Sequence, residues 1–227
     1  MSFFKSRITQ WSYSRLTTWE TCPLKARFKF VDKIKTPGSP AANRGLELHK
    51  QSAEYLTNPE MEFPIALHNV RSVLDKLRTP TVKAELQIAV TKEWTPTAWF
   101  APDVYCRVIY DVLDVSGGEA YVGDLKSGKI REEEHEDQLS LYAAAVLSTE
   151  QGVEEVTAAV FYSDHPLKKD VNPLSKTYKI SELKGLRKSW DDRAGKMLAD
   201  DIFAPKANPT CRYCDYSKKR GGACPVN

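Results

Sequence analysis

One predicted β-hairpin constrains the fold of this chain more than any other stretch. It runs from Val108 to Lys129, beginning with an apolar run rich in β-branched residues at Val108–Val115 and continuing with a shorter run at Ala120–Leu125. Between the two runs, Ser116-Gly117-Gly118 brings two glycines that tolerate the positive φ angles of a tight turn. The pattern predicts two antiparallel strands joined by a short turn.

Acidic residues interrupt both apolar runs. Asp111 lies in the first run and Asp124 in the second, and Lys126 follows Asp124 by two residues, which places both on one face of a strand. A carboxylate in an apolar strand is unfavourable without a partner, and a hard cation such as Mg²⁺ is one such partner. The pattern predicts a metal site with a lysine beside it. The same sequence pattern would also arise if Asp111 lay at an exposed strand position and Asp124 and Lys126 formed a surface ion pair.

The same stretch contains an incomplete phosphate-binding signature. Gly123–Lys129 reads G-x-x-x-x-G-K after a strand. Position 130 is Ile, so the Ser or Thr hydroxyl that would hold Mg²⁺ is missing, and the acidic block R-E-E-E-H-E-D that follows would repel a phosphate. We therefore do not expect a nucleotide-binding P-loop.

Composition limits the possible classes of protein. The chain has 227 residues, of which 41% are hydrophobic and 28% charged, so it can bury a proper core as one soluble domain with appendages. The net charge of +3 permits nucleic-acid binding without requiring it. Because no apolar run approaches the roughly 18 residues of a membrane span, and the N-terminus lacks a signal-peptide core, we expect an intracellular protein without a membrane segment.

Periodicity predicts further elements on both sides of the hairpin. Helices are expected at 15–31 with a break at Cys22-Pro23, at 41–56, 64–77 and 132–147, and after a cap at Ser181; strands are expected at 82–90, 155–162 and 177–180.

Two pairs of polar or small residues share a helical face at a spacing of four. Gly45 and His49 lie in the second helix, where the glycine leaves room for the imidazole or for a ligand. Gln138 and Tyr142 lie in the helix after the hairpin and together can hydrogen-bond a phosphodiester or a water. His49 could instead be an ordinary hydrogen-bonded polar residue, and the second pair could be a surface Gln138 beside a half-buried Tyr142. Glu85 is either solvent-facing or a further acidic group near the metal site.

Cysteine spacing predicts a second metal site. Cys211, Cys214 and Cys224 form C-x-x-C-x9-C, a good arrangement for zinc or iron–sulfur iron that is one thiolate short of four. Cys106 falls in an apolar strand, where a thiol is naturally buried, whereas Cys22 lies at a helix break and is the better fourth ligand.

The ordered set of motifs resembles the PD-(D/E)xK nuclease superfamily, and most closely its RecB-type and Cas4-like exonucleases with an iron–sulfur cluster. The opening S-Y-S-R-L-T-T-W-E-T-C-P-L resembles the start of that group. The resemblance covers almost the whole chain. It implies an α/β fold with a restriction-endonuclease-like core, in which helices flank a mixed central sheet and a four-cysteine metal cluster joins the N-terminal helices to the C-terminal tail.

The resemblance also implies roles for His49 and for residues of the hairpin. His49, Asp111 and Asp124 match the metal-binding positions, with the backbone carbonyl of Leu125 as a further ligand for Mg²⁺ or Mn²⁺. Lys126 matches the lysine that positions or activates the attacking water. Many relatives have Glu where this chain has Asp124, but RecB-type members commonly have Asp.

Further matches concern the helix after the hairpin and the cysteines. Gln138 and Tyr142 match the catalytic motif that follows the core. The ligands of a [4Fe–4S] cluster, with Zn²⁺ as the alternative, match Cys22, Cys211, Cys214 and Cys224.

The expected protein is a single nuclease domain over 1–227, made of a helical part at 1–80, the nuclease core at 81–181, a helix at 182–203 and a cysteine-rich tail at 204–227. Its expected activity is Mg²⁺- or Mn²⁺-dependent DNA exonuclease cleavage of single strands or ends, in recombination, repair or replication. The alternatives are an endonuclease, a nuclease subunit that works with a helicase or recombination protein, and a non-catalytic nucleic-acid-binding module. The expected location is the cytoplasm of a bacterial or phage-infected cell.

Overall fold

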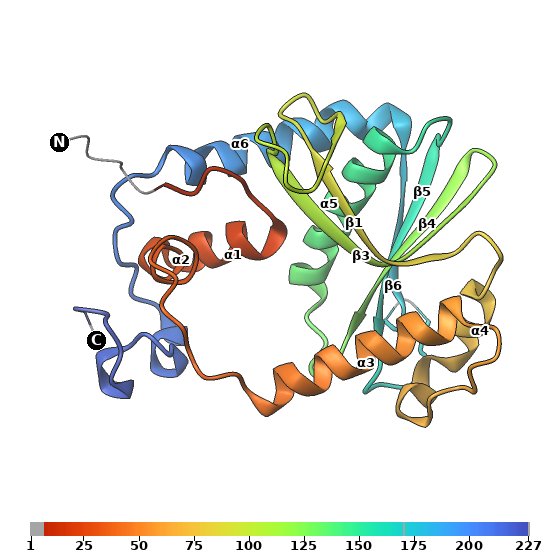
Figure 1. The fold of residues 1–227 in the computed structure, drawn as a ribbon, viewed down its shortest axis with the longest axis horizontal. Helices are drawn as coiled ribbons and strands as arrows, with labels where there is room; N and C mark the ends of the chain where they lie inside the picture. Colours follow the sequence, from red (N-terminus) through yellow and green to blue (C-terminus); the bar gives the residue numbers. More distant parts are fainter. Residues whose placement is uncertain (1–6, 170, 227) are drawn as a thin grey trace. The chain divides into compact units, whose positions relative to one another are not determined.

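The structure, a computed structural model that describes residues 7–169 and 171–226, contains a six-stranded mixed sheet (Figure 1). The strand order is β2-β1-β3-β4-β5-β6, and every neighbouring pair is antiparallel except β4 and β5. The strands are β1 Lys83–Val90, β2 Pro96–Thr97, β3 Cys106–Ser116, β4 Glu119–Lys126, β5 Glu155–Tyr162 and β6 Leu174–Lys179. A parallel pair needs a crossover, which α5 (Glu132–Thr149) provides between β4 and β5.

Helices cover both faces of this sheet. One face packs against α3 (Pro40–Thr57), the 3-10 helix η2 (Ile65–Val70) and α4 (Arg71–Leu77), through a core that includes Leu125 of β4. Asp124, the preceding residue of the same strand, is hydrogen-bonded to α5. Because successive side chains of a strand point to opposite faces, α5 lies on the other side of the sheet. The site residues of β4 are therefore held between two helical layers.

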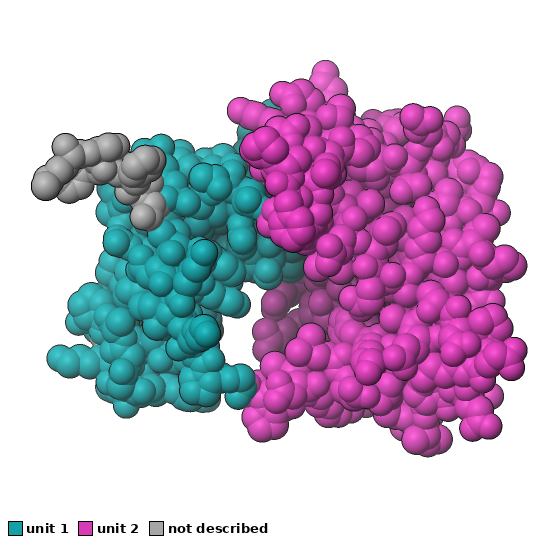
Figure 2. Space-filling model, in the orientation of Figure 1, with its two compact units in different colours: residues 1–38, 188–227 teal, residues 39–187 magenta. Residues whose placement is uncertain are grey.

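The chain divides into two compact units, shown in different colours in Figure 2: Ser39–Arg187, which contains the sheet, and Met1–Gly38 with Lys188–Asn227. The smaller unit holds α1 (Tyr13–Thr21), α2 (Pro23–Ala26), a π-helical turn η1 (Arg27–Val31), most of α6 (Leu183–Ala199), and the 3-10 helices η4 (Pro209–Tyr213) and η5 (Lys218–Arg220).

Aromatic stacking and an ion pair join the two chain segments of the smaller unit. The rings of Trp11 and Trp190 are stacked with centroids 5.8 Å apart, and both are fully buried. Nε and Nη2 of Arg193 each lie 2.9 Å from a carboxylate oxygen of Glu20. Residues from the two ends of the chain thus fold together as one unit.

The predicted hairpin is confirmed, because β3 and β4 pair antiparallel around a turn at Gly117, which has a φ of +60°. The helix break is confirmed as well, since α1 ends at Thr21 and α2 starts at Pro23. The mixed α/β fold with helices flanking the sheet matches the expected core. Among the described residues, no helix is long and apolar enough to cross a bilayer.

Two predicted elements differ from the structure. The segment predicted as one helix at 64–77 begins as a 3-10 helix, because the Leu67 N–H donates to the Pro64 carbonyl three residues back. Ser181 does not cap α6 but lies inside a 3-10 turn, η3 (Ile180–Glu182). The carboxylate of Glu182 takes the capping role by accepting the Lys179 N–H at 2.7 Å.

Candidate active site

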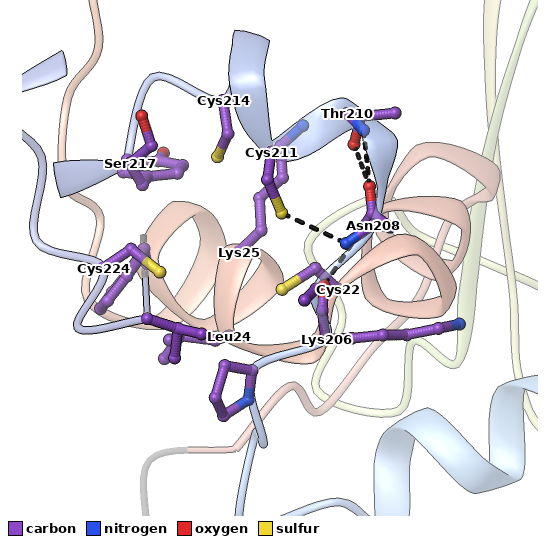
Figure 3. A pocket seen from close by; sticks show the side chains of 15 residues that line it. Cys22, Leu24, Lys25, Lys206, Asn208, Thr210, Cys211, Cys214, Ser217 and Cys224 are labelled. Carbon is purple, nitrogen blue, oxygen red and sulfur yellow. Dashed lines mark hydrogen bonds between the residues drawn. The ribbon is translucent and has the colours of Figure 1, made fainter. Parts of the chain in front are cut away.

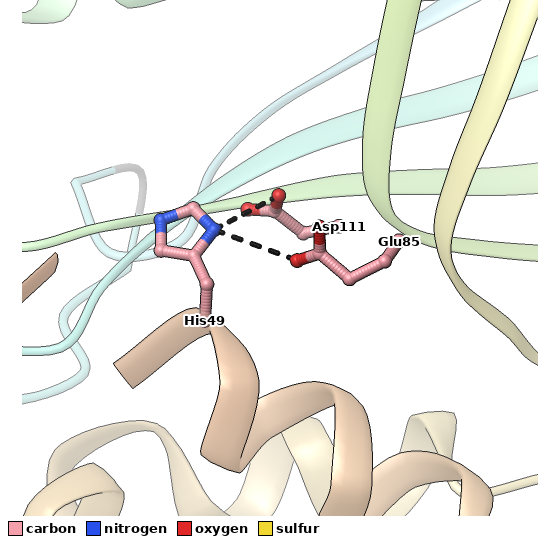
Figure 4. Close-up of side chains that lie close together, drawn as sticks. All are labelled: His49, Glu85 and Asp111. Carbon is pink, nitrogen blue, oxygen red and sulfur yellow. Dashed lines mark ion pairs between the residues drawn. The ribbon is translucent and has the colours of Figure 1, made fainter. Parts of the chain in front are cut away.

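Three side chains from three elements of the larger unit converge (Figure 4). Nδ1 of His49, on α3, lies 3.0 Å from Oδ1 of Asp111 on β3 and 3.8 Å from Oε1 of Glu85 on β1. One nitrogen and two oxygens, all within 4.8 Å of one another, are arranged closely enough to share one cation. Such a mixed set of imidazole and carboxylate ligands suits Mn²⁺ as well as harder divalent ions.

The backbone of β1 is unusual where it contributes to this group. Ala84 and Leu86 pair with Val112 and Tyr110 of β3, so Glu85 stands opposite Asp111. The φ angle of Glu85 is 51°, in the left-handed region. This conformation is unfavourable for a residue with a Cβ, and strained residues of this kind cluster at functional sites. The Glu85 side chain is 47% exposed and also lies 3.8 Å from Nδ1 of His49, so both alternatives that its sequence position allowed describe it.

The strands β3 and β4 separate at the site. Their ladder ends at Val112 paired with Gly123, and beyond that point Oδ2 of Asp111 accepts the Leu125 N–H at 2.6 Å. A side chain thus replaces the next backbone hydrogen bond and holds the Asp111 carboxylate beside β4. The carbonyl of Leu125 as a metal ligand stays a prediction.

Gly123 allows the close packing beneath the site. A Cβ at this position would lie 2.6 Å from the ring of Phe161 and 2.7 Å from a methyl of Val112, distances at which something must shift. The glycine thus lets β4 lie against its neighbours one residue before Asp124. This packing also explains the first glycine of the G-x-x-x-x-G-K signature. Because Gly123–Lys126 is strand and not loop, the segment does not form a phosphate-binding loop, as expected.

Asp124 is the most buried acidic residue of the group, with 3% of its surface exposed. Its Oδ1 accepts hydrogen bonds from Oη of Tyr142 at 2.6 Å and from Nε2 of Gln138 at 3.1 Å. Both donors are buried on α5, which excludes the alternative that this pair is an ordinary surface pair. The structure therefore joins Gln138 and Tyr142 to Asp124.

The second oxygen of Asp124 has a different environment. Oδ2 lies 2.6 Å from Nζ of Lys126, but it has no partner with hydrogen-bond geometry among the described residues. The contact is an ion pair without a directed hydrogen bond, because the distance is short while the angles are poor. A buried carboxylate oxygen with no directed partner is unfavourable, and a cation at this point would satisfy it.

The electrostatics of the two aspartates also fit a cation. Burial and the nearby charge of Asp124 raise the pKa of Asp111 to about 6, despite the opposing effect of His49. Burial alone would lower the pKa of His49, but the hydrogen bond and charge of Asp111 raise it overall. Two carboxylates held together in a buried site resist being charged at once, and a divalent ion offsets that repulsion. The donor set therefore fits a divalent cation.

The loop after β4 is clamped by residues from two other segments. The Gly128 N–H donates to Oδ2 of Asp164 at 2.7 Å, and Nη1 of Arg44 on α3 lies 2.9 Å from the same oxygen. Nε2 of His165 lies 2.7 Å from the Gly128 carbonyl. The clamp fixes the end of the strand that carries Lys126. Sequence reasoning missed it because Arg44 and Asp164 are 120 residues apart.

His135 is a further residue that the sequence did not single out. It is buried on α5 one turn before Gln138, and its Nδ1 lies 2.8 Å from Oη of Tyr162. Burial and the charge of Lys126 lower its pKa. Its only sequence signal was the helical spacing of three to Gln138, and the acidic residues around it obscured that signal.

Four cysteines line one cavity in the smaller unit, and their sulfurs point toward its centre (Figure 3). Cys22 lies between α1 and α2, and Cys211, Cys214 and Cys224 follow one another along the tail. The cavity measures about 210 Å³. Cys106 is buried in β3 of the larger unit. The structure thus brings together the four cysteines selected from the sequence, while metal binding by them stays a prediction.

The spacing of the four sulfurs can be compared with what a zinc ion requires. Within residues 7–169 and 171–226, no three cysteine sulfurs lie within 4.8 Å of one another. A tetrahedral zinc with bonds of about 2.3 Å holds its sulfurs about 3.8 Å apart. A four-iron cluster is larger than a single ion, and the choice between zinc and a cluster stays a prediction.

Gly221 and Gly222 form the turn that returns Cys224 to the cavity. Gly221 has a φ of +79°, and a Cβ on Gly222 would lie 2.3 Å from the backbone carbon of Tyr216. The Cys224 N–H donates to the Tyr216 carbonyl at 2.8 Å. A side chain at Gly222 would therefore displace the backbone that positions Cys224.

The profile of the PD-(D/E)XK nuclease superfamily matches residues 10–218, which is most of the chain. The chain belongs to this superfamily. The nuclease is similar in fold to a solved structure from Eubacterium rectale described as a candidate exonuclease, with a TM-score of 0.50 and 12% identity over 98% of this chain and 91% of that chain. It is also similar to an alkaline exonuclease from Laribacter hongkongensis, with a TM-score of 0.40 and 11% identity over 86% of this chain and 92% of that one. No curated protein matches the nuclease in sequence.

Proposed function

We propose that this protein is a metal-dependent DNA exonuclease that prefers single strands or strand ends. Membership of a nuclease superfamily supports the reaction class. The observation that carries the proposal is the environment of Asp124, a buried carboxylate with hydrogen-bond donors on one oxygen and only Lys126 beside the other. The group of His49, Glu85 and Asp111 beside it supplies further ligands for the same cation.

The proposed ligands of Mg²⁺ or Mn²⁺ are His49, Asp111 and Asp124, with Glu85 and the Leu125 carbonyl as further candidates. A bound divalent ion would lower the pKa of a water and bear charge that develops on the phosphate. The Leu125 N–H keeps the Asp111 carboxylate oriented through its 2.6 Å hydrogen bond.

Lys126 has two proposed tasks. In the structure its ammonium neutralises Asp124 at 2.6 Å. When a substrate phosphate is present, the same ammonium can donate to a phosphate oxygen or to the attacking water, because an ammonium has three donors. Gln138 and Tyr142 direct their polar groups at Asp124, so we assign them a positioning role in place of the predicted catalytic one.

We further propose that the four cysteines hold a [4Fe–4S] cluster and that the protein is of the RecB-type and Cas4-like kind. The cavity of about 210 Å³ that all four cysteines line supports a bound metal centre at this place, with zinc as the alternative. The Asn208 N–H lies 3.4 Å from Sγ of Cys211, the type of donor that stabilises a cluster sulfur. In this proposal residues 1–227 act as a single nuclease domain.

The test is cleavage by protein purified without oxygen. End-labelled linear single-stranded DNA and closed circular single-stranded DNA are compared in Mn²⁺, Mg²⁺ or EDTA, with Asp124→Ala as the control. We expect loss of the linear substrate only, dependent on both the metal and Asp124. Cleavage of the circle would replace the exonuclease with an endonuclease. Binding without cleavage of either substrate would contradict a self-sufficient enzyme and support a binding module or a subunit that needs a helicase.

A further inference from the structure

A loop at one end of the sheet exposes two aromatic rings. It joins β2 to β3 and appears yellow-green at the upper end of these strands in Figure 1. Phe100 in this loop is 86% exposed, the most exposed of the large hydrophobic side chains among the described residues, and Trp99 beside it is partly exposed. A single exposed phenylalanine is common on a protein surface, but two neighbouring rings offer a surface on which another ring can stack.

The loop is rigidly held. The Ala101 N–H donates to the Ala98 carbonyl at 2.9 Å, which closes a turn around the two rings. The hydroxyl of Thr97 donates to the carboxylate of Asp103 at 2.9 Å across the base of the loop. The backbone that carries the two rings is therefore held in place, so a partner that stacks on them orders less of the chain than it would in an unstructured loop.

An arginine from β3 supports both rings. The guanidinium carbon of Arg107 lies 5.0 Å from the centre of the Trp99 ring and 5.5 Å from that of Phe100. Nε and Nη2 of the same side chain donate to the Trp99 carbonyl at 3.0 and 2.6 Å. The guanidinium thus stays beside two exposed rings, where its positive charge can also attract a phosphate.

The same strand leads from this loop to the candidate metal site. In β3, Arg107, Ile109 and Asp111 alternate with three buried residues, so they share the accessible face of the strand. Ile109 between them is 42% exposed. Four residues of strand separate Arg107 from Asp111, a distance of about 14 Å at about 3.4 Å per residue. That distance corresponds to a few nucleotides of a single strand.

We propose that Trp99, Phe100 and Arg107 form a platform on which an unpaired base of the DNA strand stacks, a few nucleotides from the bond that is cleaved. Aromatic rings combined with a cation are the means by which proteins hold single strands without reading their sequence. The platform rests on the proposed nuclease function, because a single DNA strand is its occupant. Two rings and one guanidinium are too small an area for a stable protein interface, which buries about 800 Å² on each partner.

The test measures binding without cleavage. Fluorescence anisotropy of labelled oligo(dT) is recorded in EDTA with the full chain, Phe100→Ala and Phe100→Leu. Ile65→Ala is the matched control, because Ile65 is an 82% exposed apolar residue on η2. We expect both Phe100 variants to weaken binding by roughly fivefold to a hundredfold and the control to leave it unchanged.

Abasic nucleotides make the test specific for stacking. Single abasic sites are moved along the oligonucleotide, and one position should weaken binding by the wild type but not by Phe100→Ala. A Phe100 effect equal to that of Ile65→Ala, or an equal abasic profile in wild type and variant, would overturn the platform while leaving the nuclease proposal intact. Failure of the wild type to bind oligo(dT) would overturn the platform, while cleavage in Mn²⁺ decides the nuclease proposal separately.

Discussion

The two candidate metal sites differ in how much of their geometry the protein fixes by itself. In the carboxylate site, protein donors already hold the ligands: the Leu125 N–H holds Asp111, and Tyr142 and Gln138 hold Asp124. In the cysteine cavity, the Asn208 N–H donates a long hydrogen bond of 3.4 Å to Sγ of Cys211. We therefore expect the first site to hold its geometry without an ion, and the second to depend on its ligand for stability.

This difference leads to opposite expectations for mutation. Removing a ligand of the carboxylate site should abolish chemistry and leave the fold unchanged. Removing a ligand of the cysteine cavity should destabilise the smaller unit. Each variant below is therefore measured for both cleavage and stability.

The largest expected effect follows from Asp111→Asn, which keeps the shape and the acceptor for the Leu125 N–H but removes the charge. We expect cleavage to fall by roughly 10³-fold or more, because the charge of a proposed ion ligand is lost. The melting temperature should stay the same or rise, since a buried carboxylate next to Asp124 is no longer present.

The matched control for this variant is Asp114→Asn on the same strand. Asp114 accepts hydrogen bonds from the hydroxyls of Thr79 and Thr81 at 3.0 and 2.6 Å, outside the site. Equal loss of cleavage in both variants would mean that β3 tolerates no such change, and wild-type cleavage by Asp111→Asn would remove Asp111 from the mechanism.

The next effect is expected from Cys211→Ser. The visible absorbance of an iron–sulfur cluster should disappear, and the melting temperature should fall by roughly 10 °C, because metal binding contributes several kcal/mol to folding. Cys106→Ala is the control and should keep the absorbance. A wild type that is colourless and holds stoichiometric zinc would replace the cluster with a zinc site.

A smaller loss of cluster content and of thermal stability is expected from Gly222→Ala. The new Cβ would overlap the Tyr216 backbone and displace Cys224, so cluster content should fall and the melting temperature should drop by roughly 5 °C. Gly195→Ala in α6 is the control, because a Cβ there meets nothing within 4 Å. Full cluster content in Gly222→Ala would show that the turn is not needed to position Cys224.

The smallest effect is expected from Tyr142→Phe, which removes one of the two donors to Oδ1 of Asp124. Metal affinity, measured as the Mn²⁺ dependence of cleavage and by calorimetry, should weaken by roughly 10- to 100-fold. Tyr162→Phe removes an equally buried hydroxyl that contacts His135 and should leave the affinity unchanged. If Tyr162→Phe weakens Mn²⁺ affinity more than Tyr142→Phe does, the hydroxyl that supports the metal site is that of Tyr162 and not that of Tyr142.

Much of the fold could be predicted from local signals. The turn at Gly117, the alternation of β3 and β4 and the break at Pro23 depend on neighbouring residues, and the sequence reveals such features directly. The 3-10 helix η2 was missed because its apolar spacing also fits an α-helix.

The candidate site could be predicted only in part. His49, Asp111, Asp124 and Lys126 were identified from spacing and from the family resemblance, and the structure brings them together. The alternation of a regular strand could not predict the face of the sheet toward which the Glu85 side chain points, because the left-handed backbone of Glu85 departs from regular strand geometry. The clamp of Arg44 and Asp164 could not be predicted either, because it joins helix and loop across the unit.

The position of Cys22 beside the tail cysteines has a mechanical consequence. With a cluster bound, nearly 190 residues between Cys22 and Cys211 form a closed ring. Tension applied to the two ends of the chain would then pass through the cluster and bypass the sheet inside the ring. Only rupture of the cluster would release that hidden length, about 600 Å at full extension.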